Sequence, residues 1–134
     1  MNEPEWILKE TVLALHEQSL HEHGGSSGIR DDGLLDSALG KPQNLFAYGH
    51  PNLFDLAAGY AYYGLVKNHP FLDGNKRTGF VTAVLMLELN GFCFQATEAD
   101  AAIRTLALAA GEMTESGYAA WLEANSVNLD AQTL

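Results

Sequence analysis

Apolar side chains recur at helical spacing along most of the chain, and this pattern predicts a bundle of α-helices. The first such run begins near Glu3 or Pro4 and stops at the glycine pair 24–25, because glycine readily ends a helix. A second, short helix is expected after Asp31 or Asp32, since either side chain can cap it. The fold class that we expect is therefore all-α, with at most a short strand or hairpin.

The stretch from residue 42 to residue 52 interrupts the helical pattern. It contains two prolines and a glycine, together with the apolar side chains of Leu45, Phe46 and Tyr48. We expect an irregular or hairpin-like segment here. Such a segment could dock another chain in extended form, or it could fold back over the core.

Two further helices are expected on either side of residue 70. A helix capped by Asn52 should end near residue 69, because Pro70 disfavours helical geometry in the residue before it. The next helix should span about residues 74–90, with a glycine as its stop. It is apolar nearly all round, so we place it at the centre of the bundle.

The last third of the chain predicts two more helices after a short extended piece at residues 92–95. Thr97, with Asp100 three residues later, resembles a capping box, and Thr114 can cap the final helix. A polar tail is expected from Asn125 onward. No internal repeat or low-complexity linker interrupts these elements.

Length and charge limit the classes of function. The 134 residues are enough for a single domain, which we expect to span 1–134. With 7 basic and 17 acidic residues the formal net charge is −10, which argues against nucleic acid or an anionic membrane as a partner. Lys67, Lys76 and Arg77 are three of the few cations and lie close together, whereas the other basic residues are scattered.

A cytoplasmic protein is the simplest interpretation of the remaining composition. The single cysteine, Cys93, cannot form an internal disulfide, and the first residues lack the features of a signal peptide. The longest apolar-rich run, residues 80–89, is far shorter than the ~20 residues that span a bilayer.

Residues 67–79 contain the side chains that are the best candidates for catalysis and ligand binding. His69 is the best candidate for a general base, because imidazole can take a proton from a hydroxyl near neutral pH. Asp73, four residues later, can hold Mg²⁺, since one carboxylate plus nucleotide phosphates suits this cation.

The start of the following helix has the features of a phosphate site. The turn at Gly74 and Asn75 would point backbone N–H groups outward, where the helix dipole also favours an anion. Lys76 and Arg77 add positive charge for phosphoryl oxygens. These features together predict a phosphoryl-transfer site in which positioning and electrostatics supply most of the catalysis.

Ordinary structural roles remain possible for each of these residues. His69 could pack against a neighbouring phenylalanine, Asp73 could cap the next helix, and Lys76 and Arg77 could form its solvated face. Two cations in a first turn, however, oppose the helix dipole unless an anion offsets them. We therefore favour a functional site.

Three other residues have two interpretations. His16 and His23 are seven apart, so a metal pair is conceivable, but surface or packing roles are favoured because no third ligand accompanies them. Arg30 could reach a phosphate, although a salt bridge to a neighbouring aspartate is favoured.

The string His69-Pro-Phe-Leu-Asp-Gly-Asn-Lys-Arg77 strongly resembles the signature of the Fic/Doc family, and its lysine resembles the Doc (death-on-curing) branch. Similar stretches occur over nearly the whole chain, at 28–31, 34–38, 56–58 and 90–91. The resemblance implies a helical-bundle fold.

The resemblance also implies a role for each residue of the motif. His69 would be the base acting on a protein Ser or Thr hydroxyl, Asp73 would position Mg²⁺, and residues 74–77 would hold the phosphates of ATP. The catalytic set would then comprise His69, Asp73, Asn75, Lys76 and Arg77, and the nucleotide-binding set Gly74, Asn75, Lys76 and Arg77.

Two positions distinguish the branches of the family. Fic-type members transfer AMP, and they have glycine where this chain has Lys76 and arginine where it has Phe80. Doc-type members share the lysine and are similar to kinases that place the γ-phosphate at the reacting position. The alternatives are AMP transfer by the same residues, or a binding module of the same fold without catalysis.

The Doc branch also implies partners. Its members are toxins that act on elongation factor Tu, a translation protein, and a small Phd-type antitoxin restrains them. By resemblance to the flap of the family, residues 41–50 are our expectation for the segment that docks the target.

Overall fold

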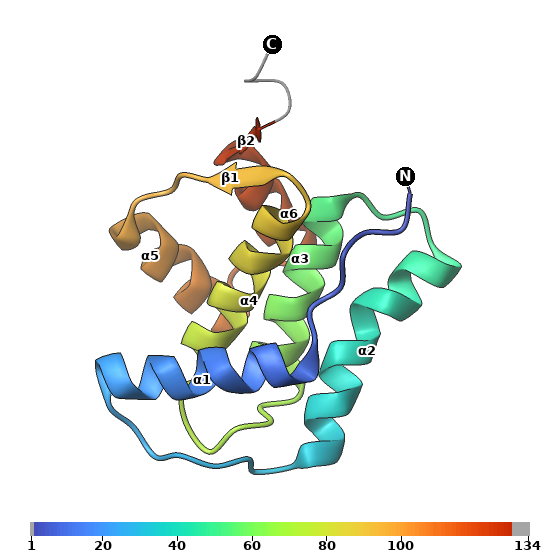
Figure 1. Cartoon of the computed structure of the whole chain (residues 1–134). Helices are drawn as coiled ribbons and strands as arrows, with labels where there is room; N and C mark the ends of the chain where they lie inside the picture. The colour runs from blue at the N-terminus through green and yellow to red at the C-terminus, as the bar shows by residue number, and fades with distance from the viewer. Residues whose placement is uncertain (1, 130–134) are drawn as a thin grey trace.

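The computed structural model describes residues 2–129 and confirms a mostly helical fold (Figure 1). Six α-helices, one π-helical turn and one antiparallel pair of strands make up this part of the chain. In chain order they are α1 (Lys9–His23), α2 (Asp32–Tyr48), α3 (Leu53–Tyr62), the π-helical turn η1 (Tyr63–Lys67), α4 (Asn75–Leu89), β1 (Phe92–Phe94), α5 (Glu98–Ala109), α6 (Glu115–Ala124) and β2 (Ser126–Asn128).

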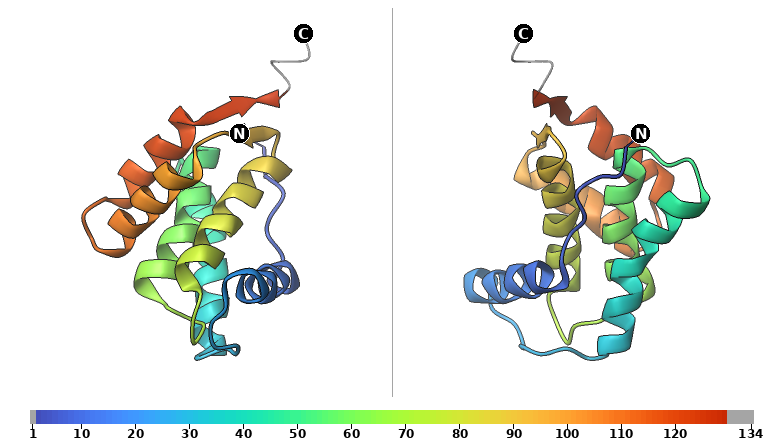
Figure 2. Two further views of the ribbon diagram at one scale, coloured as in Figure 1. Left: turned by 90° about the vertical axis from the view of Figure 1, so that its left-hand side faces the viewer. Right: turned by 45° about the vertical axis from the view of Figure 1, so that its right-hand side comes forward.

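Helix α3 is the most deeply buried element of the bundle. Eight of its ten residues are buried, against seven of fifteen in α4. Small side chains such as Ala57 and Ala61, which have no exposed surface, let α2, α4 and α6 approach α3 closely. Helix α4 packs along α3, and α1 crosses both at a steep angle (Figures 1 and 2). We predicted that α4 alone would form the centre of the bundle. Instead α3 and α4 form it together, because α4 leaves Val81 and Leu89 exposed on its outer side.

The start of the first helix differs from the prediction. Residues 2–8 are extended, and α1 begins only at Lys9. The side chain of Asn90 accepts a hydrogen bond from the Glu5 N–H (2.8 Å) and donates one to the Glu5 carbonyl (3.1 Å). The Tyr60 hydroxyl accepts a further bond from the Ile7 N–H (3.3 Å). These partners satisfy the backbone groups that a helix would otherwise pair.

The prediction of an irregular segment after Pro42 is wrong. Helix α2 continues through Pro42 to Tyr48, and the proline ring is buried against Gly59 of α3. Because proline lacks the N–H that would bond four residues back, this packing offsets a lost helical hydrogen bond. At ~1.5 Å per residue the end of α2 lies roughly 25 Å from its start.

The expected polar tail contributes a strand. Residues 126–128 pair antiparallel with β1, so that Phe92 lies opposite Asn128 and Phe94 opposite Ser126. The polar side chains of this tail do not prevent pairing, because the strand needs only backbone groups for its hydrogen bonds. Residues 130–134, the rest of the predicted tail, lie outside the described part of the chain.

The predicted caps at Thr97 and Thr114 are confirmed, since their side chains accept bonds from the backbone N–H groups of Asp100 and Gly117. The Asp100 carboxylate does not complete a capping box. It accepts bonds from Trp121 Nε1 (2.8 Å) and Arg104 Nε (3.2 Å) instead. These bonds, chiefly the one from Trp121, lower the pKa of Asp100, and the Trp121 bond ties α5 to α6.

A bilayer-spanning helix is not found among residues 2–129, because none there combines sufficient length with sufficient hydrophobicity. One continuous apolar core takes side chains from all six helices. We infer from this core that the described residues form one domain.

Replacing Asn90 by aspartate tests the attachment of the N-terminal segment. An aspartate cannot donate to the carbonyls of Glu5 and Met86, which now accept from Asn90 Nδ2 at 3.1 and 2.8 Å. We expect Asn90→Asp to lower the free energy of unfolding by about 1–3 kcal/mol, as measured by urea denaturation. Asn44→Asp, on the exposed face of α2, is the matched control; an equal effect of both changes would contradict this role for Asn90.

Candidate functional site

The motif predicted to be functional forms the loop between η1 and α4. The π-helical turn closes with a bond from the Asn68 N–H to the Tyr63 carbonyl (3.0 Å). His69 then adopts a φ of 44°, and it is the one non-glycine residue with positive φ among residues 2–129. A left-handed backbone of this kind costs a non-glycine residue about 1–3 kcal/mol and is concentrated at functional sites.

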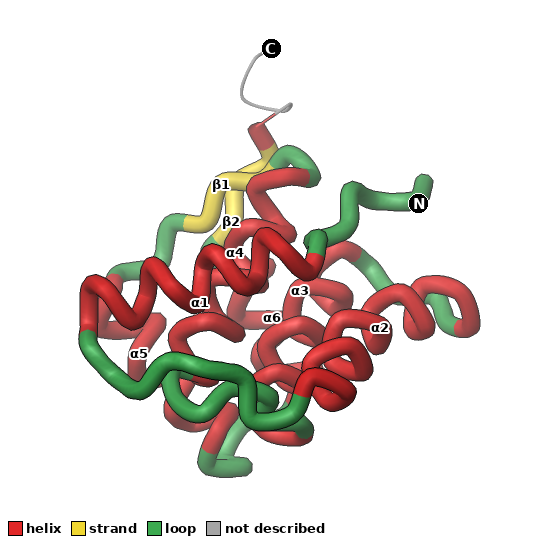
Figure 3. Tube along the Cα trace, turned by 60° about the horizontal axis from the view of Figure 1, so that its bottom comes forward, coloured by secondary structure: helices red, strands yellow, loops and turns green. Residues whose placement is uncertain are grey.

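A second loop, between α1 and α2, lies alongside this one (Figure 3). The Leu72 N–H donates to the Gly28 carbonyl (3.1 Å), and Ile29 forms an antiparallel bridge with Phe71. The two loops are about forty residues apart in sequence, yet their backbones pair as a miniature ribbon. The start of α2 therefore lies beside the site, and residues 41–50 form the last two turns of this helix and the two residues after it.

Arg30 connects the two loops, which the sequence did not predict. Its guanidinium donates to the carbonyl oxygens of Asn68 (Nη2, 2.7 Å) and His69 (Nε, 2.8 Å). The favoured salt bridge to a neighbouring aspartate is wrong, because Asp31 caps α2 and Asp32 pairs with Lys9. The guanidinium is directed at the loop backbone and not at a phosphate site.

The side chain of Asn75 closes the turn from within. Its Oδ1 accepts from the Phe71 N–H (3.0 Å), and its Nδ2 donates to the Phe71 carbonyl (3.1 Å). These two bonds fix the orientation of the amide, which also places Nδ2 3.4 Å from Nδ1 of His69. Asn75 is buried, and these bonds order the loop and place its amide against the His69 ring.

His16 supports the same loop from α1. Its ring stacks on Phe71 with centroids 3.7 Å apart, and its Nε2 lies 2.8 Å from the Asp73 carbonyl oxygen. Because a carbonyl can only accept, Nε2 carries the hydrogen. The favoured packing role is thus confirmed for His16, which is buried, whereas His23 is exposed. Within residues 2–129 no group of three or more potential metal ligands exists.

The Asp73 carboxylate lies between the two loops. Its Oδ1 accepts from the Gly74 N–H (2.8 Å), and its Oδ2 accepts from the Ser26 N–H (3.3 Å). Gly25 approaches so closely that a Cβ there would lie 2.7 Å from Oδ2. The carboxylate is exposed, so its oxygens remain accessible for a further ligand.

The first turn of α4 contains no protein anion, although the Asp73 carboxylate precedes the helix and accepts from the N–H of its N-cap residue. Gly74 is the N-cap in a left-handed conformation (φ 79°), no side chain caps the helix, and its first turn contains no acidic residue. Asp73 is therefore not its cap, contrary to the ordinary structural alternative. Lys76 and Arg77 make no ion pair with any carboxylate of the described chain. These cations and free N–H groups are suited to binding an external anion.

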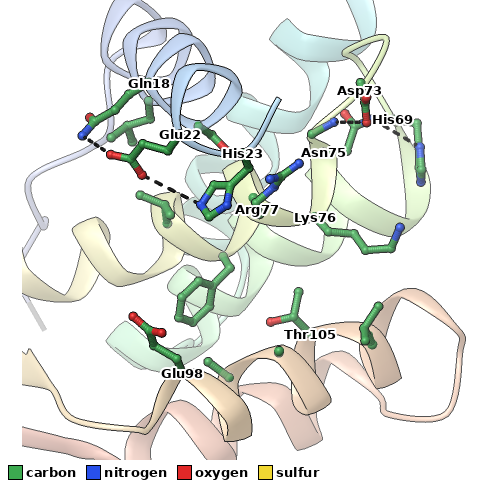
Figure 4. A pocket seen from close by; sticks show the side chains of 18 of the residues that line it. Gln18, Glu22, His23, His69, Asp73, Asn75, Lys76, Arg77, Glu98 and Thr105 are labelled. Atoms are coloured by element: carbon green, nitrogen blue, oxygen red, sulfur yellow. Dashed lines mark hydrogen bonds and ion pairs between the residues drawn. The ribbon is translucent and has the colours of Figure 1, made fainter. Parts of the chain in front are cut away.

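A cleft of about 800 Å³ brings these groups together (Figure 4). Side chains of α1 and α4 face Glu98 and Thr105 of α5 across it. Its polar end is formed by the motif, and its apolar lining comes chiefly from α4 and α5, together with Leu15 of α1 and Leu72 of the loop. The residues lining it are Leu15, Gln18, Ser19, Glu22, His23, His69, Leu72, Asp73, Gly74, Asn75, Lys76, Arg77, Phe80, Val81, Glu98, Ala101, Ala102, Thr105 and Leu106. This volume is in the range of small-molecule sites.

The wall opposite the motif is rigidly packed. Phe80 contacts the rings of Phe94 and Trp121, with centroids 5.9 and 6.5 Å away. Thr105 shares a 2.9 Å hydrogen bond with Tyr118 in the core behind it. Burial raises the pKa of Tyr118 to about 12, although the bond to Thr105 offsets part of this rise. The Tyr118 hydroxyl therefore stays protonated, and its role is to hold Thr105 in the wall of the cleft.

The donor set fits magnesium and phosphates. The accessible carboxylate of Asp73, the one within the motif, suits a cation that takes its remaining ligands from phosphates and water, whereas the two other carboxylates that line the cleft belong to Glu22 of α1 and Glu98 of α5. Lys76, Arg77 and the N–H groups at the start of α4 offer donors to phosphoryl oxygens. Three of the residues that build the site, His16, Ser26 and Arg30, were not predicted to do so. Two of them gave a signal: His16 occupies the apolar stripe of its helix between Val12 and Leu20, and Arg30 lies in the stretch 28–31 that resembles the family.

Substitutions at the two adjacent glycines of the first loop test the placement of Asp73. In Gly25→Ala the methyl group would force the Asp73 carboxylate to move, so we expect Mg²⁺-ATP to bind at least about 10-fold more weakly by calorimetry. Gly24→Ala is the control, because φ is also positive at this position (78°) but a Cβ would meet no atom within 4 Å. Equal losses in both variants would show that loop strain, and not Asp73, is responsible.

Comparison with known proteins agrees with this geometry. The model of the Fic/DOC family matches residues 6–87. The chain is 34% identical over 115 residues to "Protein kinase doc" of Escherichia phage P1, covering 84% of this chain and 89% of the relative. It is 44% identical over 90 residues to "Toxin Doc" of Mycolicibacterium smegmatis (strain ATCC 700084 / mc(2)155), covering 65% of each chain. The chain therefore belongs to the Fic/DOC family.

Proposed function

We propose that this protein is a Doc-type toxin that transfers the γ-phosphate of ATP to a Ser or Thr hydroxyl of a translation protein. The observation that carries the proposal is the cleft in which His69, the Asp73 carboxylate and two cations of α4 meet, the latter without an ion pair in the part of the chain that the structure describes. The similarity to a relative named protein kinase doc supports the choice of a kinase reaction.

In the proposed reaction the target hydroxyl oxygen attacks the γ-phosphorus of ATP. The bond between that phosphorus and the β,γ-bridging oxygen breaks, ADP leaves, and the hydroxyl proton passes to His69. Lys76, Arg77 and the first N–H groups of α4 bind the phosphates and stabilise the developing negative charge. Asp73 would hold Mg²⁺, which neutralises phosphate charge when bound.

His69 is accessible for the role of base. Its side chain is exposed, and Nδ1 faces the Asn75 amide at 3.4 Å. The amide offers a donor, so in the neutral ring this contact favours a lone pair on Nδ1 and the hydrogen on Nε2. Because the contact is long, a substrate hydroxyl can replace it at Nδ1.

Two side chains support γ-phosphate transfer over AMP transfer. Lys76 projects from the first turn of α4 beside the proposed phosphates, where it would occupy part of the cradle. Phe80 places an apolar ring, in contact with Phe94 and Trp121, at the position where Fic-type members have an arginine. The chain therefore lacks that charged partner for the terminal phosphates. Adenylyl transfer by the same cleft is the alternative.

We further propose elongation factor Tu or a similar translation protein as the target, and a Phd-like antitoxin as the restraining partner. The relative named Toxin Doc supports the toxin role. With a net charge of −10 the chain suits a basic antitoxin segment. The end of α2, which we expected to dock the target, lies along the helix away from the motif, so its position lends that expectation no support.

Radiolabelled ATP distinguishes the two nucleotide reactions. Incubation with purified elongation factor Tu and γ-labelled ATP should label the target, whereas α-labelled ATP should not. His69→Ala should reduce labelling by about 100-fold or more, because the base is lost. His23→Ala is the matched control, since this histidine also lines the cleft but has no proposed role.

Label transferred only from the α position would replace the kinase proposal by adenylyl transfer. Expression in bacteria adds an independent measurement. His69→Ala should relieve growth inhibition, and His23→Ala should not. If His69→Ala inhibits growth as strongly as the parent, the protein acts by occupying a partner and not by catalysis.

A further inference from the structure

Arg30 pairs with three successive carbonyl groups of the loop that contains His69. Its Nη2 and Nε donate to the carbonyl oxygens of Asn68 (2.7 Å) and His69 (2.8 Å). Its backbone N–H donates to the carbonyl oxygen of Pro70 (2.7 Å). Within residues 2–129 its guanidinium makes no ion pair, so the bonding capacity of this side chain is directed at the loop.

The loop needs an external restraint at this point. His69 is left-handed, with a φ of 44°, and Pro70 follows it directly. A side chain with a Cβ disfavours this conformation, and the proline restricts the preceding residue further. Such a conformation persists only where neighbouring groups hold it.

Other contacts hold the two sides of His69 but not its carbonyl. Asn68 is fixed by its own bonds to the carbonyls of Tyr63 (3.0 Å) and Leu34 (2.7 Å). Asn75 fixes Phe71 on the other side. Among the described residues, Arg30 is the hydrogen-bond donor to the His69 carbonyl, and also to that of Asn68.

We infer that Arg30 is a positioning residue that holds His69 in its left-handed conformation and so aims the imidazole at the substrate hydroxyl. This inference rests on the proposed function, because it assigns Arg30 a role in the same reaction. Arg30 is exposed and does not line the cleft, so it acts through the loop backbone and not through contact with ATP.

The geometry requires an arginine and not merely a positive charge. Nε and Nη2 lie on one edge of the planar guanidinium and donate to two adjacent carbonyls at once. A lysine ammonium is a single point on a flexible stem and cannot reproduce this fork. The conservative change therefore separates the loss of geometry from the loss of charge.

Kinetics of Arg30→Lys and Arg30→Ala test the inference with elongation factor Tu as the substrate. We expect kcat to fall about 10- to 100-fold in both variants, because a small misplacement of the base has this effect. The KM for ATP should change by less than about 3-fold, since the phosphate donors stay in place. Arg104→Lys is the matched control: this exposed arginine pairs with Asp100 and does not line the cleft. Added guanidinium at low millimolar concentration should restore part of the activity of Arg30→Ala, and it should not restore His69→Ala.

Two measurements that do not depend on activity accompany the kinetics. In Arg30→Lys the backbone chemical shifts of His69 should leave the left-handed range, and the Leu72 amide should exchange faster. Cooperative thermal unfolding should persist. If Arg30→Lys keeps the parental kcat, or loses cooperative unfolding altogether, the positioning role is overturned.

The same experiments separate this inference from the proposed function. A parent protein that transfers no phosphate from ATP contradicts the proposed function alone, provided that the His69 shifts still depend on Arg30. An active parent whose Arg30 variants keep kcat and the His69 shifts contradicts the positioning role alone.

Discussion

The site depends on the backbone pairing between two loops that lie about forty residues apart in sequence. Residues 28–31 supply donors and acceptors to the turn at residues 68–72, including the bond from Leu72 to Gly28 and the bridge between Ile29 and Phe71. Without these partners the turn would carry unpaired carbonyls and a left-handed histidine, both of which cost free energy. The conformation of the motif is therefore a property of the tertiary structure, and the nine-residue string alone would not maintain it.

The charges around this turn favour the binding of an anion. The chain has an excess of acidic residues, yet no carboxylate among residues 2–129 pairs with Lys76 or Arg77 at the positive end of α4. Protein carboxylates could have offset this arrangement, as Asp32 and Asp36 do for Lys9. Their absence from the first turn of α4 keeps a local positive field inside an acidic molecule. An anion with several negative charges gains most from such a field.

Much of the fold followed from the sequence because local signals were strong. Asn52, Thr97 and Thr114 cap helices as predicted, since a short polar side chain at a helix start has one dominant use. Pro42 misled the prediction, because its local effect is to break a helix, whereas its burial against Gly59 is a tertiary contact. The extended residues 2–8 have the same explanation: Asn90, 85 residues from Glu5, supplies the bonds that replace the first helical turn.

The residues of the site also fall into those that local sequence signals predict and those that depend on tertiary contacts. His69, Asp73, Lys76 and Arg77 were predicted together because they are neighbours in sequence and share one helix start. His16 and Arg30 were not predicted to support them, because their partners are carbonyl groups, which leave no trace in side-chain patterns. A sequence motif thus identifies the groups that we propose to meet the substrate more readily than those that hold them in place. In this fold the holding groups converge on the backbone between residues 68 and 73, so changes in the first loop or in α1 can alter catalysis without touching the motif.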